Sequence, residues 1–214
     1  MIKKRIETLR KKFDEFDIDG YVIPKNDEFF SEYAQKDRLK IISNFTGSAG
    51  FAIILKKKNY LFVDGRYTIQ AKIESGDFFK IVSYEKLVNC RLFKNIKLGI
   101  DPSLFTSSQV SNFFLKFNNV KKIETNLIDT IFNKYSINSK KFFSLSKNVV
   151  GEGHNSKIRK VSSYLRKNKS NYIFISAPEN VAWLLNIRGY DNPNSPIPNC
   201  RLFLSADKKI FLVA

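Results

Sequence analysis

The sequence has little of what a disulfide framework or a zinc site requires. Among its 214 residues there are only two cysteines and one histidine. Cys90 and Cys200 stand far apart and form no Cys-X-X-Cys motif, so the sequence predicts neither a disulfide framework nor a zinc centre. A reducing compartment is therefore expected, and the cytosol is the default location.

A histidine-based catalytic set is equally hard to find. His154 is the single histidine, and it lies in a Gly-Glu-Gly-His-Asn segment typical of a linker, which predicts a surface position. A Ser-His-Asp arrangement would have to use this residue, and no Gly-X-Ser-X-Gly elbow is present. Asp27, Glu28 and Glu32 are close in sequence, but closeness in sequence does not define a hydrolytic carboxylate pair. The residues show no recognisable catalytic set.

Long apolar runs are also missing. No stretch approaches the roughly 18 apolar residues of a membrane helix, and the first residues, MIKKRIETLRKKF, lack the apolar core of a signal peptide. The hydrophobic content of 43% and the aromatic content of 14% are nevertheless sufficient for a packed core. A globular chain that neither spans nor enters a membrane is expected.

Acidic residues are few relative to basic ones. Lys and Arg number 37 against 20 Asp and Glu, which gives a net charge of +17. A nucleic-acid binder gathers such charge on one face, whereas here it is spread in short clusters such as Lys3 to Arg5 and Lys56 to Lys58. A solvated surface is the preferred interpretation, with a polyanion site as the alternative. Nucleic acid is not an expected partner.

Hydrophobic periodicity predicts alternating helices and strands. Ile2, Ile6, Leu9, Phe13 and Phe16 recur at helical spacing. The remaining elements expected before residue 136 are strands at 21–23, 50–55, 59–64, 78–84 and 98–100, and helices at 68–74, 110–117 and 127–135. Such a mixture is typical of an α/β layer domain.

The same order of elements begins again about 150 residues later. A helix face at Ile158, Val161 and Leu165 precedes a strand at 172–175 and a hairpin at 202–204 and 210–213. We therefore predict a first domain at 1–147, and a linker with an incomplete second domain of the same architecture at 148–214. A half-built sheet would expose an apolar face and unpaired edges, so the chain is expected to be a piece of a longer protein.

Two motifs stand out from this pattern. In SNFTGSAGFAIIL, from Ser43 to Leu55, the glycines are followed by a strand and not by a helix, which argues against a phosphate cradle. We expect Gly47 and Gly50 to take backbone angles forbidden to other residues.

The second motif is LFVDGRYTIQA, from Leu61 to Ala71. One interpretation is that Asp64 fixes the turn by contacting Arg66 or the backbone. The other is that Arg66 and Tyr67 face a ligand or a partner subunit.

These runs resemble the N-terminal region of Xaa-Pro aminopeptidases (aminopeptidase P), in the creatinase/prolidase superfamily. The resemblance covers nearly the whole chain in order, through TGSAG, DGRY and WLLNIRG. The matching segments are 19–33, 43–51, 61–71, 126–132, 156–165 and 180–199. Departures are Tyr190, where a small residue is common, and NSPIPN in place of the usual asparagine-proline run.

The resemblance implies a creatinase N-terminal-like domain, a mixed sheet flanked by helices, followed by the start of a second such domain. The parent would be a dimeric cytoplasmic metallopeptidase that removes the residue preceding proline. Its two divalent metal ions, manganese or zinc, would be held in a pita-bread catalytic domain that is absent here, so no catalytic or metal-binding residue is assigned to this chain.

The chain itself is expected to be inactive, to restrict substrate access and to support dimerisation. Candidate residues for that role are Gly47, Ser48, Gly50, Asp64, Arg66 and Tyr67. A stand-alone binding module or pseudoenzyme is the alternative.

Overall fold

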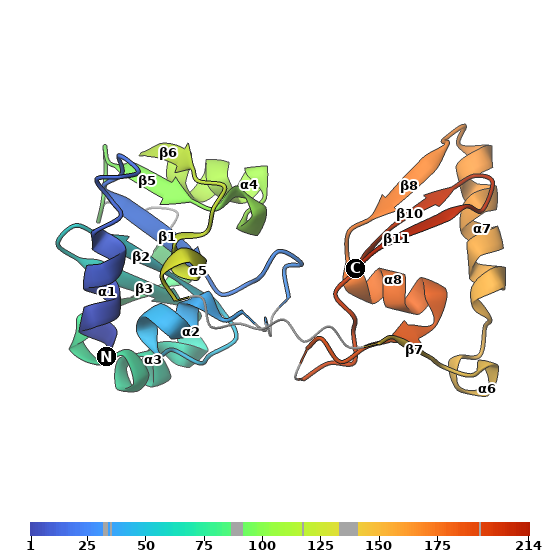
Figure 1. The fold of residues 1–214 in the computed structure, drawn as a ribbon, viewed down its shortest axis with the longest axis horizontal. Helices are drawn as coiled ribbons and strands as arrows, with labels where there is room; N and C mark the ends of the chain where they lie inside the picture. Colours follow the sequence, from blue (N-terminus) through green and yellow to red (C-terminus); the bar gives the residue numbers. More distant parts are fainter. Residues whose placement is uncertain (32–33, 35, 87–91, 117, 133–140, 193) are drawn as a thin grey trace. The chain divides into compact units, whose positions relative to one another are not determined.

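The computed structural model describes residues 1–31, 34, 36–86, 92–116, 118–132, 141–192 and 194–214 (Figure 1). It consists of two compact units, Met1–Tyr135 and Ser136–Ala214. Both combine helices with β-sheet, which confirms the predicted α/β class.

The first unit is built on a six-stranded mixed sheet of order β4-β3-β2-β1-β5-β6. β2 is antiparallel to both of its neighbours, β1 and β3, whereas β4, β5 and β6 each run parallel to a neighbour. The strands are β1 (Gly20–Pro24), β2 (Gly50–Leu55), β3 (Asn59–Val63), β4 (Lys80–Ser83), β5 (Lys97–Ile100) and β6 (Asn119–Lys122). The predicted hairpin at 50–64 is confirmed as β2 and β3.

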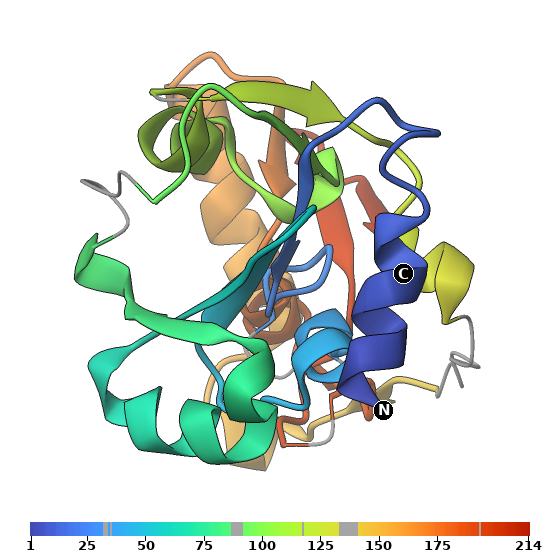
Figure 2. The same ribbon diagram turned by 90° about the vertical axis from the view of Figure 1, so that its left-hand side faces the viewer.

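Helices cover both faces of this sheet (Figure 2). One core lies between the sheet and α1 (Ile2–Arg10), α2 (Arg38–Ser43), α3 (Thr68–Ser75) and α5 (Leu127–Ile131). The second core lies on the other face, under α4 (Ser107–Val110) and the π-helical turn η5 (Ser111–Leu115). Short 3-10 turns are η1 (Gly65–Tyr67), η2 (Gly76–Phe78), η3 (Tyr84–Lys86) and η4 (Pro102–Leu104).

The first helix is shorter than the sequence predicted. α1 ends at Arg10, because the backbone N–H groups of Lys12 and Phe13 bond to carbonyls three residues back instead of four. Asp17, with a φ of 45°, then turns the chain toward β1. Phe13 stays in the core at 1% exposure, so the apolar pattern marks burial beyond the end of the regular helix.

The second unit contains a three-stranded antiparallel sheet of order β11-β10-β8. Apolar side chains of α7 and α8 pack on one face of it, which confirms the predicted helix, strand and hairpin. The elements are α6 (Lys147–Val150), α7 (His154–Lys167), α8 (Pro178–Leu185), β7 (Phe143–Ser144), β8 (Tyr172–Ile175), β9 (Ile187–Arg188), β10 (Arg201–Ser205) and β11 (Ile210–Val213).

The division between the units falls earlier than the predicted boundary after residue 147. β7 pairs with β9 in antiparallel register, with Phe143 opposite Arg188 and Ser144 opposite Ile187. The segment before residue 147 therefore belongs to the second unit. Its polar composition is typical of a linker, which is why the sequence did not show this pairing.

Candidate functional site

Two segments carry all six predicted site residues. Gly47 and Ser48 lie between α2 and β2, and Gly50 is the first residue of β2; the segment Asn44 to Gly50 is here called the glycine loop. Asp64, Arg66 and Tyr67 lie in the turn Asp64 to Tyr67 between β3 and α3, here called the arginine turn. Pairing of Gly50 with Val63 joins the base of the one segment to the base of the other.

A side-chain contact connects the two segments. The hydroxyl oxygens of Ser48 and Tyr67 are 2.9 Å apart, a hydrogen-bond distance. The Tyr67 ring meets that of Phe45 edge to face, with centroids 5.9 Å apart. The structure therefore brings together residues that lie 19 positions apart in the sequence.

The glycines of the loop are required for space and not for backbone angle. Neither has a positive φ; among the described glycines only Gly76 and Gly151 do. A Cβ on Gly47 would lie 2.3 Å from Cζ of Phe45, and one on Gly50 would lie 3.0 Å from the carbonyl oxygen of Phe62. The expectation of forbidden angles is wrong: the constraint at Gly47 is the fully buried Phe45 ring, and at Gly50 it is the Phe62 carbonyl oxygen together with that ring.

The glycine loop is also fixed to α3 by polar contacts that the sequence analysis missed. The Glu74 carboxylate accepts hydrogen bonds from the backbone N–H of Thr46 at 2.7 Å and from its hydroxyl at 2.6 Å. Gln70, one turn earlier on α3, donates to Glu74 and to the Thr46 hydroxyl. Burial opposes ionisation of Glu74, but these hydrogen bonds outweigh it and hold its pKa below the ordinary value.

The arginine turn is organised as the first interpretation predicted. The Asp64 carboxylate accepts from the backbone N–H and from Nε of Arg66, both at 2.9 Å. These hydrogen bonds, first from the side chain and then from the backbone, lower the pKa of Asp64. The Arg66 side chain stays 74% exposed, and its guanidinium carbon lies 5.5 Å from the Tyr67 ring centroid. Asp64 thus orients the Arg66 side chain and leaves it exposed to solvent.

The carboxylates after β1 serve the fold. Arg38, 1% exposed, donates to Glu28 at 2.6 Å and to Asp129 of α5 at 2.7 and 2.9 Å. The Asp27 carboxylate accepts from two backbone N–H groups, and its burial raises its pKa. Glu32 lies outside the described residues. Asp27 and Glu28 are therefore engaged in holding the loop after β1.

No metal centre is formed by the part of the chain that the structure describes, since no three His, Cys, Asp or Glu side chains are grouped there. His154 is exposed at the first position of α7, as predicted. Cys200 is a buried free thiol whose pKa burial raises to about 11; Cys90 lies outside the described residues. In the described chain no helix has the length and apolar character needed to cross a bilayer.

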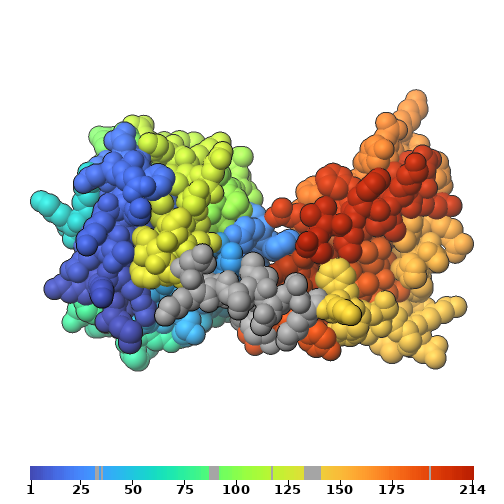
Figure 3. Space-filling model, viewed as in Figure 1, coloured from blue at the N-terminus to red at the C-terminus, as the bar shows by residue number. Residues whose placement is uncertain are grey.

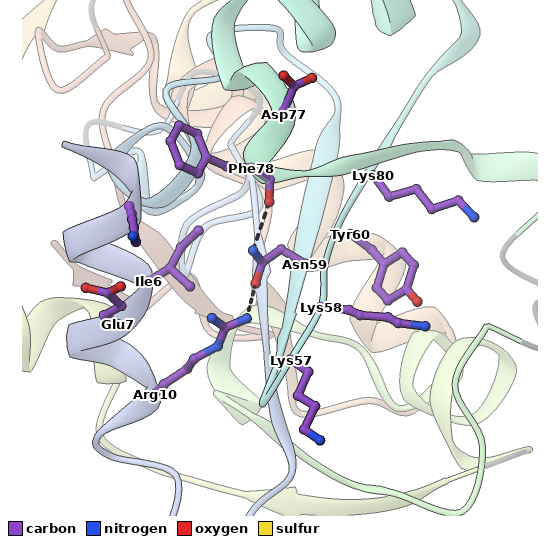
Figure 4. A pocket seen from close by; sticks show the side chains of 11 residues that line it. Ile6, Glu7, Arg10, Lys57, Lys58, Asn59, Tyr60, Asp77, Phe78 and Lys80 are labelled. Atoms are coloured by element: carbon purple, nitrogen blue, oxygen red, sulfur yellow. Dashed lines mark hydrogen bonds between the residues drawn. The ribbon is translucent and has the colours of Figure 1, made fainter.

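A hollow of about 600 Å³ lies beside α1 and the β2–β3 turn (Figure 4). Arg10 donates to Asn59 Oδ1 at 2.8 Å, and Asn59 in turn donates to the carbonyl oxygen of Phe78. Figure 4 shows Lys57 and Lys80 pointing away from Arg10. A polyanion site would require the cations around the hollow to converge, and they do not.

Comparisons with known proteins agree with this architecture. A family model described as the creatinase/prolidase N-terminal domain matches residues 5–130, and a second model of that description matches 133–214. The chain is 28% identical to the probable Xaa-Pro aminopeptidase P of Laccaria bicolor, over 98% of this chain and 35% of that protein. It is 32% identical to that of Pyrenophora teres f. teres, over 90% of this chain and 32% of the relative.

A solved structure shares the fold. The X-prolyl aminopeptidase of Caenorhabditis elegans, described as a cytosolic enzyme with a di-nuclear active site, matches with a TM-score of 0.87 at 24% identity. The match covers 99% of this chain and 38% of that one. The chain thus spans about a third of the length of the relatives it matches.

Proposed function

Because the chain belongs to the creatinase/prolidase N-terminal domain family, we propose that it is the non-catalytic N-terminal part of a metal-dependent Xaa-Pro aminopeptidase. One observation carries the proposal. Two N-terminal family models in tandem account for nearly all of this chain, while relatives with aminopeptidase names are about three times as long. The enzyme would be cytosolic and would act on peptides with proline at the second position.

The chemistry explains why the catalytic groups would lie elsewhere. An Xaa-Pro bond is a tertiary amide with no N–H, and the proline ring restricts the residue before it. Paired divalent ions, manganese or zinc in this proposal, supply an oriented hydroxide for its hydrolysis. The described residues of this chain do not offer ligands for such a pair, so no chemical step is assigned to them.

What this chain would contribute is selection of substrate and support of a homodimer. The glycine loop is fixed by Phe45, Ser48 and the Glu74 contacts. The adjoining arginine turn presents Arg66 to solvent from this rigid base. A fixed cation near the entrance to an active site would bind the free carboxylate of a short peptide, and long or folded chains would be excluded.

The test uses the full-length protein. Arg66→Ala is expected to reduce turnover of short Xaa-Pro peptides or to weaken the dimer, measured by initial rates and by native mass. Lys72→Ala, which removes an exposed cation from the following helix α3, is the matched control and should change neither. Wild-type values for both measurements in Arg66→Ala would remove Arg66 from the proposal.

The chain 1–214 by itself provides a second test. Purified with added manganese, it is expected to leave Xaa-Pro peptides uncut. Metal-dependent release of the first residue by this chain would overturn the assignment of catalysis to another domain.

A further inference from the structure

Two helices, one in each unit, end in the same way. α2 ends at Asn44 and α8 ends at Asn186, and both asparagines adopt the left-handed conformation, with φ of 65° and 56°. This conformation is unfavourable for a residue with a side chain, although asparagine tolerates it better than most. The chain after each asparagine leads into a strand that pairs on both sides, β2 or β10. The direction in which each loop leaves its helix is therefore set at an asparagine.

In the first unit a cation from α1 holds this helix end. α1 lies beside α2 (Figure 1), and Arg5 of α1 donates from Nη1 to Asn44 Oδ1 at 2.8 Å. The same nitrogen donates to the carbonyl oxygen of Ile41 at 2.6 Å. The last carbonyls of a helix lack partners within it and form the negative end of its dipole. Arg5 therefore binds two acceptors at the point where the glycine loop begins.

In the second unit Lys157 of α7 makes the same pair of contacts. Its Nζ donates to Asn186 Oδ1 and to the carbonyl oxygen of Trp183, both at 2.7 Å. As in the first unit, that carbonyl belongs to the third residue before the asparagine. Lys157 is 4% exposed, and its ammonium lies 4.2 Å from the Trp183 ring centroid. A buried cation is costly unless its protons have partners, so these contacts are part of the folded core.

The surrounding residues follow the same order in the two units. The basic residue stands immediately before a core isoleucine, Ile6 or Ile158. Three residues after the asparagine comes a glycine, Gly47 or Gly189. A Cβ would approach the nearest side-chain atom to 2.3 Å at Gly47 and to 2.8 Å at Gly189. A contact that recurs in this detail indicates a requirement of the loop that follows it.

Several segments meet at Asn186. Its Nδ2 donates to the carbonyl oxygen of Glu152 at 3.0 Å, and its own carbonyl oxygen accepts from the backbone N–H of Leu145 at 2.9 Å. β9 begins at the next residue. Because Lys157 binds the same amide side chain, its contact fixes the start of β9 relative to both neighbouring segments.

We propose that Arg5 and Lys157 are positioning residues, each of which fixes the following loop through the asparagine that it binds. In the first unit that loop is the glycine loop, so Arg5 would act on substrate selection without touching a peptide. This second part rests on the proposed function, in which the glycine loop contributes to the selection of peptides. The fixing of the two loops does not depend on it.

Amide hydrogen exchange of the full-length protein tests the positioning. Arg5→Met keeps an unbranched apolar stem and removes the donors. It should raise exchange across residues 43–50 by about fivefold or more, because opening the loop no longer breaks these contacts. Lys157→Met should do the same across residues 186–192. Wild-type exchange across 43–50 in a folded Arg5→Met protein would overturn the inference.

Arg10→Met is the matched control. Arg10 lies on the same helix and also donates to a carbonyl oxygen and to an asparagine side chain, those of Leu55 and Asn59, both at 2.8 Å. These contacts are at the β2–β3 turn, so their loss should lower the unfolding midpoint and leave exchange of the glycine loop unchanged. If Arg10→Met loosened that loop as much as Arg5→Met does, Arg5 would have only a general structural role and the inference would fail.

Arg5→Lys should restore wild-type exchange of the glycine loop. Lys157 shows that one ammonium group can make both contacts at such a helix end. Loosening in Arg5→Lys as great as in Arg5→Met would contradict the equivalence of the two basic residues. If Lys157→Met does not fold, the two variants of Arg5, which is only half-buried, still decide.

Kinetic measurements on the full-length protein separate the inference from the proposed function. With short Xaa-Pro peptides, Arg5→Met should raise KM by about threefold or more and leave kcat within about twofold of wild type. Arg5→Lys and Arg10→Met should change neither. A loosened glycine loop with wild-type KM would support the positioning and reject that loop as a selecting element. Absence of turnover in wild type, with the loop still loosened by Arg5→Met, would reject the proposed activity alone.

Discussion

At the scale of single residues, Gly47 decides whether the glycine loop can close. The ring of Phe45, which is fully buried, occupies the position of a Cβ at Gly47. Gly47→Ala should therefore destabilise the chain by about 1–3 kcal/mol, as overpacking of a tight site does. Denaturant unfolding of the two proteins measures this difference.

Gly65→Ala is the matched control for Gly47→Ala. A Cβ at Gly65 would meet no atom within 4 Å, and its backbone φ is not positive, so its stability should stay within about 0.5 kcal/mol of wild type. Equal stability of the two variants would show that the Phe45 ring can move aside and that the loop is softer than we infer.

Gly47 also shows which part of the site the sequence could not predict. The glycines and the motif were visible in the sequence, and so was the Asp64 contact that fixes the arginine turn. The steric reason for glycine was not visible, because Phe45 is only two residues from Gly47 and the sequence does not show that its buried ring turns back toward that residue. The buried Arg38 was missed because its partner Asp129 lies 91 residues away.

At the scale of elements, the contact between the glycine loop and α3 should depend on pH. The pKa of Glu74 is lowered in the folded state from an ordinary value of 4.5. Its contribution to stability is therefore full above that value and is lost as the pH falls through the lowered folded pKa. Between about pH 7 and pH 3.5, wild type should lose more stability than Glu74→Gln, which keeps the shape but not the charge.

Unfolding midpoints at the two pH values measure this effect. Glu85→Gln is a suitable control, because Glu85 is an exposed carboxylate in the turn η3 and is not part of the contact between the glycine loop and α3. A wild-type protein no more sensitive to acid than Glu74→Gln would contradict the role assigned to Glu74.

Elements with strong periodicity were predicted correctly, whereas short ones were missed. β2, β3, α7 and the β10–β11 hairpin follow clear apolar patterns. β6 was missed because its residues Asn119–Lys122 are mostly exposed and polar at the sheet edge. α2 was missed because it is six residues long and buries a charged side chain, Arg38, which no hydrophobic pattern reveals.

At the scale of the whole molecule, the two units should unfold separately. Six buried apolar residues form the core cluster of the second unit, against clusters of 19 and ten in the described part of the first. The only tryptophan, Trp183, lies in the second unit with the Lys157 ammonium 4.2 Å from its ring centroid. Its fluorescence should change at a lower urea concentration than the main loss of far-ultraviolet circular dichroism. If the fluorescence and circular dichroism unfolding curves superimposed, they would indicate a single cooperative unit.

Matched core variants assign the two transitions. Leu202→Ala and Leu61→Ala each truncate a fully buried leucine and should cost about 2–5 kcal/mol. Leu202→Ala should move the fluorescence transition, and Leu61→Ala should move the later one. The internal repeat that underlies this division was readable from the sequence, but the position of the boundary was not, because it depends on the pairing of β7 with β9.

The open edge of β11 has a consequence for handling the isolated chain. Four consecutive apolar residues, Ile210–Val213, offer unpaired amide and carbonyl groups to any extended neighbour, which is how cross-β fibres begin. Lys208 and Lys209 stand at the entrance to this strand, and their like charges on adjoining molecules oppose stacking. Concentrated salt screens that repulsion, so dilute buffers of low ionic strength should keep the chain dispersed.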